Sequence, residues 1–204
     1  VIDYALLSHE LEPWARSPRE EIQDIGMGLH SLLIGDFAPL ESRLESVLAR
    51  LRAVPGSLEA TTEALEPRAI PLVWIESTLP DVRSVRTFVA NEVPVAAKGV
   101  PALSEDMKKA CEPAVDALDD FESLLQDARS VADGQFAIGG ERFDRTLRRF
   151  HMLDMDSAEL LAFGQEQVAE YERQITEVAA EIDPDSHWMD VLERVKDDHP
   201  EPEG

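Results

Sequence analysis

Apolar residues recur at steps of three and four along most of the chain, which is the spacing of an α-helix that buries one face. The clearest run begins near Ser104 and reaches about Asp133, with a kink expected at Pro113. A second run follows Asp156 and ends at Pro184. The first apolar seam comprises Met107, Cys111, Ala114, Leu118, Phe121, Leu125 and Ala128, and the second comprises Leu161, Gly164, Val168, Tyr171, Ile175, Val178 and Ile182.

Shorter helical patterns precede these two runs. Residues 1–15 have the pattern of the end of a helix that Pro13 closes or bends. The Ser-Pro-Arg-Glu run at 17–20 is typical of a capping box and predicts a helix that Gly35 ends. Gly26 lies inside this helix and favours close packing against a neighbour.

A third pattern predicts a helix over 38–53, with Arg43 among the residues of its solvent-facing side. The Pro55-Gly56 pair predicts a turn, and Ser57 then starts a short helix.

The next predicted helix covers 68–92, where Pro80 is expected to kink or split it. Residues 93–101 contain two prolines and a glycine and predict a connection. Gly134 is placed to follow the C-terminus of the first long helix.

Between the two long helices the sequence predicts a loop at 135–140, a short helix near 141–150 and a second loop. Asp156 then stands at an N-cap position with Glu159 three residues on, which is the spacing of a capping box. One more short helix is expected over 186–195. The predicted fold is all-α, with about seven or eight helices in an elongated multi-helix bundle.

We expect one helical domain over 1–204, with a linker-like acidic end at 198–204. The 204 residues are enough for a substantial core. No apolar run approaches the ~18 residues that a membrane span needs, and no leader pattern opens the chain. We therefore expect a cytoplasmic protein without a membrane partner.

The composition is strongly acidic, with 42 Asp and Glu against 19 Lys and Arg and a formal net charge of −23. Such a chain repels phosphate backbones, so a nucleic-acid partner is not expected. The single cysteine excludes an internal disulfide and a thiolate cluster. Cys111 lies on an apolar seam and is expected in the core, as are Trp14, Trp74, Trp188 and Tyr171.

No residue pattern identifies a catalytic, cofactor-binding or metal-binding residue. None of the five histidines stands in His-Glu-x-x-His, the helical zinc pair, and Glu-x-x-His, which a di-iron bundle needs, does not occur. His151 with Asp154, and His187 with Asp190, each place two potential ligands one turn apart. The alternative for both pairs is a surface or capping interaction.

The one basic cluster lies between the long helices. It can balance the charge of neighbouring acidic helices, or it can bind an anionic group such as a substrate carboxylate. The candidate anion-contact residues are Arg142, Arg145, Arg148, Arg149 and His151.

Several stretches resemble, in collinear order, the bacterial family called domain of unknown function 885. These stretches are Asp36-Phe-Ala-Pro-Leu-Glu-Ser-Arg-Leu, Ala49-Arg-Leu-Arg-Ala-Val-Pro, Phe136-Ala-Ile-Gly-Gly-Glu-Arg-Phe-Asp-Arg-Thr-Leu, His151-Met-Leu-Asp, Ser157-Ala-Glu-Leu-Leu-Ala-Phe-Gly and Trp188-x-x-Val-Leu-x-x-x-Lys-x-Asp-His-Pro-Glu-Pro. The resemblance covers essentially the whole chain.

This resemblance implies a larger, largely helical parent similar to zinc carboxypeptidases of the thermophilic Taq type. Their His-Glu-x-x-x-His-like zinc motif lies in a C-terminal half, so no family metal ligand or catalytic glutamate maps onto this chain. The resemblance implies zinc and a peptide-like substrate in the parent, with no cofactor in this segment.

Two functions follow as hypotheses. In the first, the chain is a non-catalytic N-terminal helical segment of a zinc-dependent peptidase or amide hydrolase. It forms part of the substrate cleft wall, is inactive alone, and binds the missing catalytic half or self-associates. In the second, the chain is a stand-alone helical binding or scaffold module without enzymatic activity.

Overall fold

The structure, a computed structural model, describes residues 2–198, so most of the acidic end expected at 198–204 lies outside the described residues. Between residues 2 and 198 it contains helices and no strand, including eight α-helices of ten or more residues. The prediction of an all-α bundle of seven or eight helices is confirmed. The elements are α1 (Ile2–Leu11), α2 (Pro13–Arg16), α3 (Arg19–Ile34), α4 (Leu40–Ala64), η1 (Pro67–Ala69), α5 (Leu72–Thr87), η2 (Phe88–Glu92), α6 (Val93–Ala97), α7 (Pro101–Ala128), α8 (Gly140–Arg149), α9 (Ser157–Ile182) and α10 (Trp188–Asp197).

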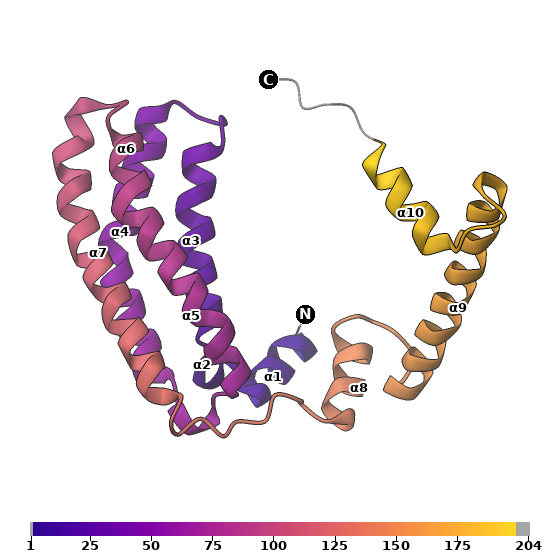
Figure 1. Cartoon of the computed structure of the whole chain (residues 1–204). Helices are drawn as coiled ribbons and strands as arrows, with labels where there is room; N and C mark the ends of the chain where they lie inside the picture. The colour runs from indigo at the N-terminus through magenta and orange to yellow at the C-terminus, as the bar shows by residue number, and fades with distance from the viewer. Residues whose placement is uncertain (1, 199–204) are drawn as a thin grey trace. The chain divides into compact units, whose positions relative to one another are not determined.

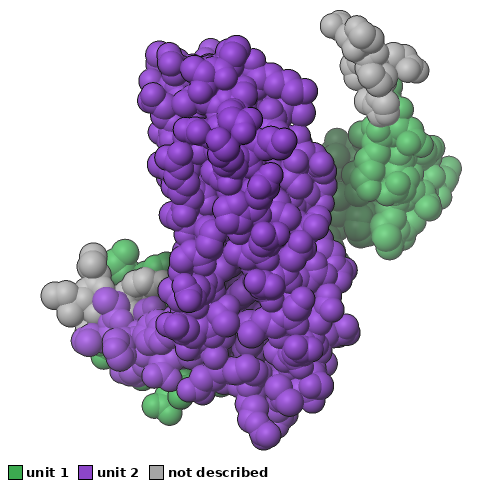
Figure 2. All heavy atoms as spheres, turned by 90° about the vertical axis from the view of Figure 1, so that its left-hand side faces the viewer, with its two compact units in different colours: residues 1–4, 139–204 green, residues 5–138 purple. Residues whose placement is uncertain are grey.

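Contacts group the chain into two compact units, which Figure 1 shows as ribbons and Figure 2 distinguishes by colour. One unit is Ala5–Ile138, and the other is Val1–Tyr4 with Gly139–Gly204. This grouping does not test the single domain expected over 1–204, which stays a prediction.

The unit Ala5–Ile138 is built on four long helices that run side by side (Figure 1). Helix α4 packs against α3 and α7, and α5 packs against the same two helices, so the four enclose one core. Every residue of the apolar seam predicted for α7 is buried in that core. Burial of this seam is the main stabilising contribution of α7, since each fully buried large apolar side chain contributes about 1.5–3 kcal/mol.

Three ion pairs connect α5 to α7 along their length: Arg129 with Glu76, Arg83 with Glu122, and Arg86 with Asp119. The residue numbers of the partners fall along α7 as they rise along α5, so the two helices run antiparallel. The Arg86 guanidinium donates through two nitrogens to Asp119, and this contact raises the pKa of Arg86. Five of these six side chains are 40–57% exposed and Glu122 is 17% exposed, so the pairs define the register more than they add stability.

Prolines inside the helices do not end them, which corrects the turn expected at Pro55 and the split considered at Pro80. The kink considered at Pro80 stays a prediction. Helix α4 continues through Pro55 and Gly56, where the sequence predicted a turn, and α5 continues through Pro80. Val54 and Leu58 are buried on either side of the predicted turn. Keeping both side chains in the core offsets the loss of about 3 kcal/mol that an interior proline causes.

Two further local predictions are wrong. Ser17 does not cap α3; it ends α2, and its N–H donates to the Pro13 carbonyl at 2.7 Å, while Pro18 takes the N-cap position without a side-chain bond. Residues 93–97 are helical rather than a connection. Pro94 has no N–H to give to the preceding turn, and the helix widens into the π-helical η2 just before it.

Arg43, which the pattern placed on a solvent-facing side, is 8% exposed. Its guanidinium donates to three backbone carbonyls, those of Leu32 and Leu33 at the end of α3 and that of Ala38 in the next loop. A helix end leaves its last four carbonyls without partners inside the helix. Arg43 supplies donors to two of them and adds a positive charge where the helix dipole favours one.

Gly134 is not the residue that ends α7, which stops at Ala128. Instead the 133–134 backbone pairs with the segment before α5, through Asp133 N–H to Arg68 O and Gly134 N–H to Ile70 O, both 3.2 Å. A Cβ on Gly134 would lie 2.0 Å from the Ala69 carbonyl oxygen. The glycine therefore permits close backbone approach. At Gly26 in α3 a Cβ would lie 2.8 Å from a side-chain methyl of Val85, so the missing Cβ leaves room for that side chain.

In the unit containing residues 139–204, α8 and α10 both contact α9. The predicted Asp156 capping box is present. The Asp156 carboxylate accepts from the N–H groups of Ala158 and Glu159 at 2.9 Å, and Glu159 accepts in return from Asp156 N–H. The apolar seam predicted for α9 is largely exposed, and Ala179 is the buried residue of this helix.

Replacing Asp156 with alanine is expected to lower the free energy of unfolding of this unit by about 1 kcal/mol, because two backbone N–H groups of α9 lose their acceptor. Urea unfolding followed by circular dichroism measures the change. Asp154→Ala, two residues before the cap, is the matched control and should change stability by less than about 0.5 kcal/mol. Equal effects of the two substitutions would contradict the capping role.

Cys111 lies in the core, as expected, and burial is the main cause that raises its pKa to about 11. The thiolate is the reactive form, so Cys111 should react with a thiol reagent such as dithionitrobenzoate at least about 100-fold more slowly in the native protein than in urea. Stopped-flow absorbance measures both rates. Rapid native labelling at pH 8 would show that α7 opens locally.

Candidate functional site: a groove between α3 and α5

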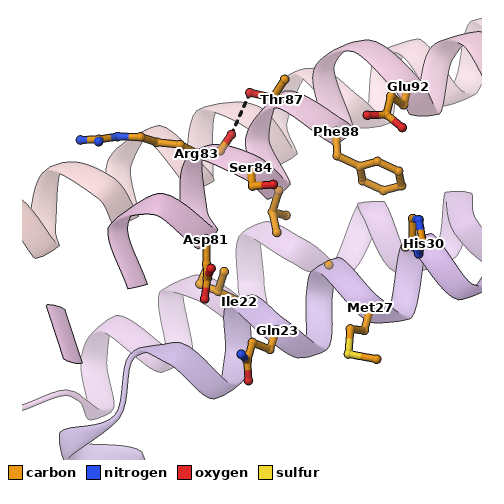
Figure 3. A pocket seen from close by; sticks show the side chains of 12 residues that line it. Ile22, Gln23, Met27, His30, Asp81, Arg83, Ser84, Thr87, Phe88 and Glu92 are labelled. Atoms are coloured by element: carbon orange, nitrogen blue, oxygen red, sulfur yellow. Dashed lines mark hydrogen bonds between the residues drawn. The ribbon is translucent and has the colours of Figure 1, made fainter. Parts of the chain in front are cut away.

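In the unit Ala5–Ile138, a groove of about 750 Å³ with both polar and apolar walls lies between α3 and the end of α5 with η2 (Figure 3). Its floor forms where the two helices approach closely at Gly26 and Val85, beside the fully buried Ile22. The lining residues are Ile22, Gln23, Gly26, Met27, His30, Asp81, Arg83, Ser84, Val85, Thr87, Phe88 and Glu92.

One end of the groove is aromatic and also carries Glu92 (Figure 3). The His30 and Phe88 rings meet edge to face, with centroids 5.8 Å apart and an interplanar angle of 62°. Met27, one turn before His30 on α3, also lines the groove and is 73% exposed. Phe88 begins the π-helical turn, a type of distortion that is frequent at functional sites.

Polar groups line the rest of the groove. Asp81 faces the α3 side chains and is held by Arg19 at 3.0 Å, while Arg83 is drawn away from the groove by Glu122 at 2.7 Å (Figure 3). The Thr87 hydroxyl donates to the Arg83 carbonyl at 2.8 Å. This arrangement offers an apolar contact at one end and hydrogen-bonding groups at the other. It can hold an amphipathic chain.

The structure places the basic cluster predicted from the sequence on α8, in the other unit. Helical periodicity puts Arg142, Arg145 and Arg149 on one side, with Phe143 and Leu147 on another. The sequence offered these arginines, with Arg148 and His151, as contacts for an anion. Nothing in the structure tests that role, and it stays a prediction.

Helix α8 is joined to α9 through Asp144, whose carboxylate accepts from Ser157 N–H at 2.8 Å. The hydrogen bonds from Ser157 lower the pKa of Asp144, and the charge of Arg148 adds to this effect. Arg148 therefore contributes to the charge balance of this junction.

The histidine pairs have different surroundings. The His151 ring packs edge to face on Phe150, with centroids 4.7 Å apart. His187 is the N-cap of α10, and its Nδ1 accepts from Met189 N–H at 3.3 Å, which is the capping alternative considered for the pair with Asp190. Within residues 2–198, no group of three or more His, Cys, Asp or Glu side chains is placed to hold a metal ion.

Sequence reasoning missed the α3–α5 groove. The sequence predicted this helix but gave no reason to select Met27 and His30, which line the groove. The available signal was Pro94, whose missing N–H favours a widened turn at Phe88. Tyr171 and Trp14, both expected in the core, are 65% and 46% exposed.

The comparisons with known proteins locate the chain in a family. Among the described residues, no helix combines the length and the apolar character needed to cross a membrane. No curated protein and no solved structure matches the chain. The sequence model of one family, described as bacterial protein of unknown function (DUF885), matches residues 1–203, and the chain belongs to that family.

Proposed function

We propose that this chain is a non-catalytic helical segment of a zinc-dependent peptidase or amide hydrolase, in which the α3–α5 groove forms part of the wall of the substrate cleft. The observation that carries the proposal is the groove itself, with His30, Phe88 and Met27 at one end and Asp81 and Ser84 at the other. The proposal includes two further statements. The family is related to zinc carboxypeptidases, and the zinc ligands lie in another part of the parent protein.

The groove suits an extended peptide for physical reasons. An apolar side chain of the peptide loses contact with water against Met27 and Phe88. Peptide N–H and C=O groups pair with Gln23 and the Ser84 hydroxyl. Glu92 favours a peptide that carries a positive charge.

The test uses the purified 204-residue chain and the hexapeptide Lys-Ala-Ala-Ala-Ala-Leu with free ends. We expect chemical-shift changes at groove residues in ¹⁵N spectra at millimolar peptide, with no hydrolysis and no stoichiometric zinc by elemental analysis. Met27→Glu should weaken binding about tenfold, which corresponds to about 1.4 kcal/mol. Val95→Glu is the control, because Val95 is 60% exposed and lies outside the groove.

Shift changes spread evenly over the chain, or equal binding by both variants, would remove the groove from the proposal. Turnover with tightly bound zinc would overturn the non-catalytic assignment.

The exposed seam of α9 favours a second candidate, a stand-alone helical binding or scaffold module. The reading frame of the source gene separates the two functions. A His-Glu helix motif encoded downstream of residue 204 supports the hydrolase segment, whereas a stop codon there supports the module.

A further inference from the structure

The charged side chains that line the α3–α5 groove are not all paired. Asp81 pairs with Arg19 at 3.0 Å, and Arg83 pairs with Glu122 at 2.7 Å. Glu92 lies at the aromatic end, and in the part of the chain that the structure describes its carboxylate has no cationic partner and no hydrogen-bond donor. It leaves a negative charge in the groove that a cationic ligand can neutralise.

The π-helical η2 presents Glu92 together with Phe88. The Val93 N–H donates to the Phe88 carbonyl, which closes the five-residue turn. Val89 and Val93 are completely buried, and each directly follows one of the two groove residues, so the core holds the turn in place. Phe88 and Glu92 are four residues apart, and residues at that spacing are neighbours on a helix surface. The carboxylate and the ring can therefore contact the same ligand (Figure 3).

Helix α3 contributes a second ring and a thioether to this end of the groove. The His30 ring meets the Phe88 ring edge to face, with centroids 5.8 Å apart, and Met27 lines the groove one turn earlier on α3. An aromatic ring attracts a cation that lies over it within about 6 Å of its centroid. The unbranched methionine side chain adapts its shape to an apolar neighbour. This end of the groove thus combines a negative charge, aromatic rings and a flexible apolar surface.

These features select a ligand side chain with an apolar stem and a cationic end. An anionic side chain is repelled by Glu92, and a purely apolar one takes water from the carboxylate without replacing it by a partner. Arginine suits the site better than lysine. Its guanidinium is planar, is more weakly hydrated than an ammonium group, stacks on aromatic rings and donates two parallel hydrogen bonds to a carboxylate.

We propose that the aromatic end of the α3–α5 groove is a subsite for an arginine side chain of the bound peptide. The stem of the arginine lies along Met27 and Phe88, and its guanidinium donates to the Glu92 carboxylate. The inference rests on the proposed function, because it assigns which side chain of the peptide occupies this end of the groove. The residues of the subsite all belong to the unit Ala5–Ile138.

The experiment compares two hexapeptides on the full chain, acetyl-Arg-Ala-Ala-Ala-Ala-Leu and the same peptide with citrulline in place of arginine. Acetylation removes the charge of the amino terminus, and citrulline keeps the shape of arginine without its charge. We expect the arginine peptide to bind about tenfold more tightly. The largest chemical-shift changes in ¹⁵N spectra should fall on residues 27–30 and 88–92. A lysine peptide should bind with intermediate affinity.

Two variants locate the preference. Glu92→Gln should reduce the ratio of the two affinities to less than about threefold. Glu45→Gln is the matched control, because it removes an exposed carboxylate on α4, outside the groove, and changes the net charge equally. It should keep the tenfold ratio. Phe88→Leu should weaken the arginine peptide about threefold and leave the citrulline peptide unchanged. Because each variant is judged by a ratio, a change in its stability does not imitate the result.

Equal binding of the two peptides in the groove would overturn the subsite and leave the groove as a peptide site. A preference that survives Glu92→Gln, or that Glu45→Gln lowers equally, would come from the net charge of −23 and would also overturn it. If neither peptide shifts the groove resonances, acetyl-arginine amide and acetyl-citrulline amide decide. A preference for the arginine amide at Glu92 would support the subsite and remove the peptide from the proposed function, whereas equal binding would overturn both.

Discussion

Replacing Gly134 with alanine is expected to lower the free energy of unfolding of the α3–α7 bundle by about 3 kcal/mol. The added Cβ would lie 2.0 Å from the carbonyl oxygen and 2.5 Å from the carbonyl carbon of Ala69, and 2.6 Å from the carbonyl carbon of Ile70. All three are backbone atoms, so no side chain can move aside. The 133–134 segment has to separate from the segment before α5. It then loses the bonds from Asp133 N–H to Arg68 O and from Gly134 N–H to Ile70 O.

Gly56→Ala is the matched control, since a Cβ at Gly56 meets nothing within 4 Å. Alanine favours the helix at that position, and we expect α4 to gain about 0.5–1 kcal/mol. Equilibrium unfolding in urea, followed by tryptophan fluorescence and circular dichroism, gives both changes. A loss below about 1 kcal/mol for Gly134→Ala would mean that the 133–134 backbone adjusts freely, contrary to its packing against Ala69.

The seam of α7 shows what could be predicted from sequence. Its seven apolar residues are all buried, as their spacing indicated. Periodicity depends on the geometry of a single helix and therefore locates the apolar side correctly. The same pattern on α9 located an apolar side that its neighbours α8 and α10 leave exposed. Periodicity does not say which element covers a helix, because that depends on contacts between elements far apart in sequence.

The rules that proline and glycine end a helix or form a turn failed where tertiary packing outweighed these local preferences. Pro55 and Gly56 form a turn signal in isolation, but the burial of Val54 and Leu58 holds α4 continuous. The sequence placed Gly134 at a helix end. The position requires a residue without a Cβ because Ala69, 65 residues earlier in the chain, packs against it. The α3–α5 groove has the same origin, since Gly26 brings together side chains that no short stretch of sequence connects.

The sequence did not reveal the role of Arg43, because Arg43 lies among the polar positions of its helix. Its replacement should lower the free energy of unfolding about as much as Gly134→Ala does. We expect Arg43→Met to lower the free energy of unfolding by about 3 kcal/mol, since buried acceptors left without donors typically cost 1–3 kcal/mol each and such effects add only in part. Methionine preserves much of the buried stem, so the change reports mainly on the guanidinium. The carbonyls affected are those of Leu32, Leu33 and Ala38, at 2.9, 3.1 and 2.9 Å.

Arg52→Met on the same helix is the matched control. Its partner is Asp106 at 3.6 Å, both side chains are more than half exposed, and such a surface pair contributes at most about 0.5 kcal/mol. Arg43→Lys should fall between the two, because an ammonium group cannot donate to three carbonyls in the planar arrangement of a guanidinium. Amide hydrogen exchange should locate the damage at the last turn of α3, around Leu32 and Leu33. If the free energies of unfolding of Arg43→Met and Arg52→Met instead agree within about 0.5 kcal/mol, water must replace Arg43 as the donor to the three carbonyls. The end of α3 would then not depend on Arg43.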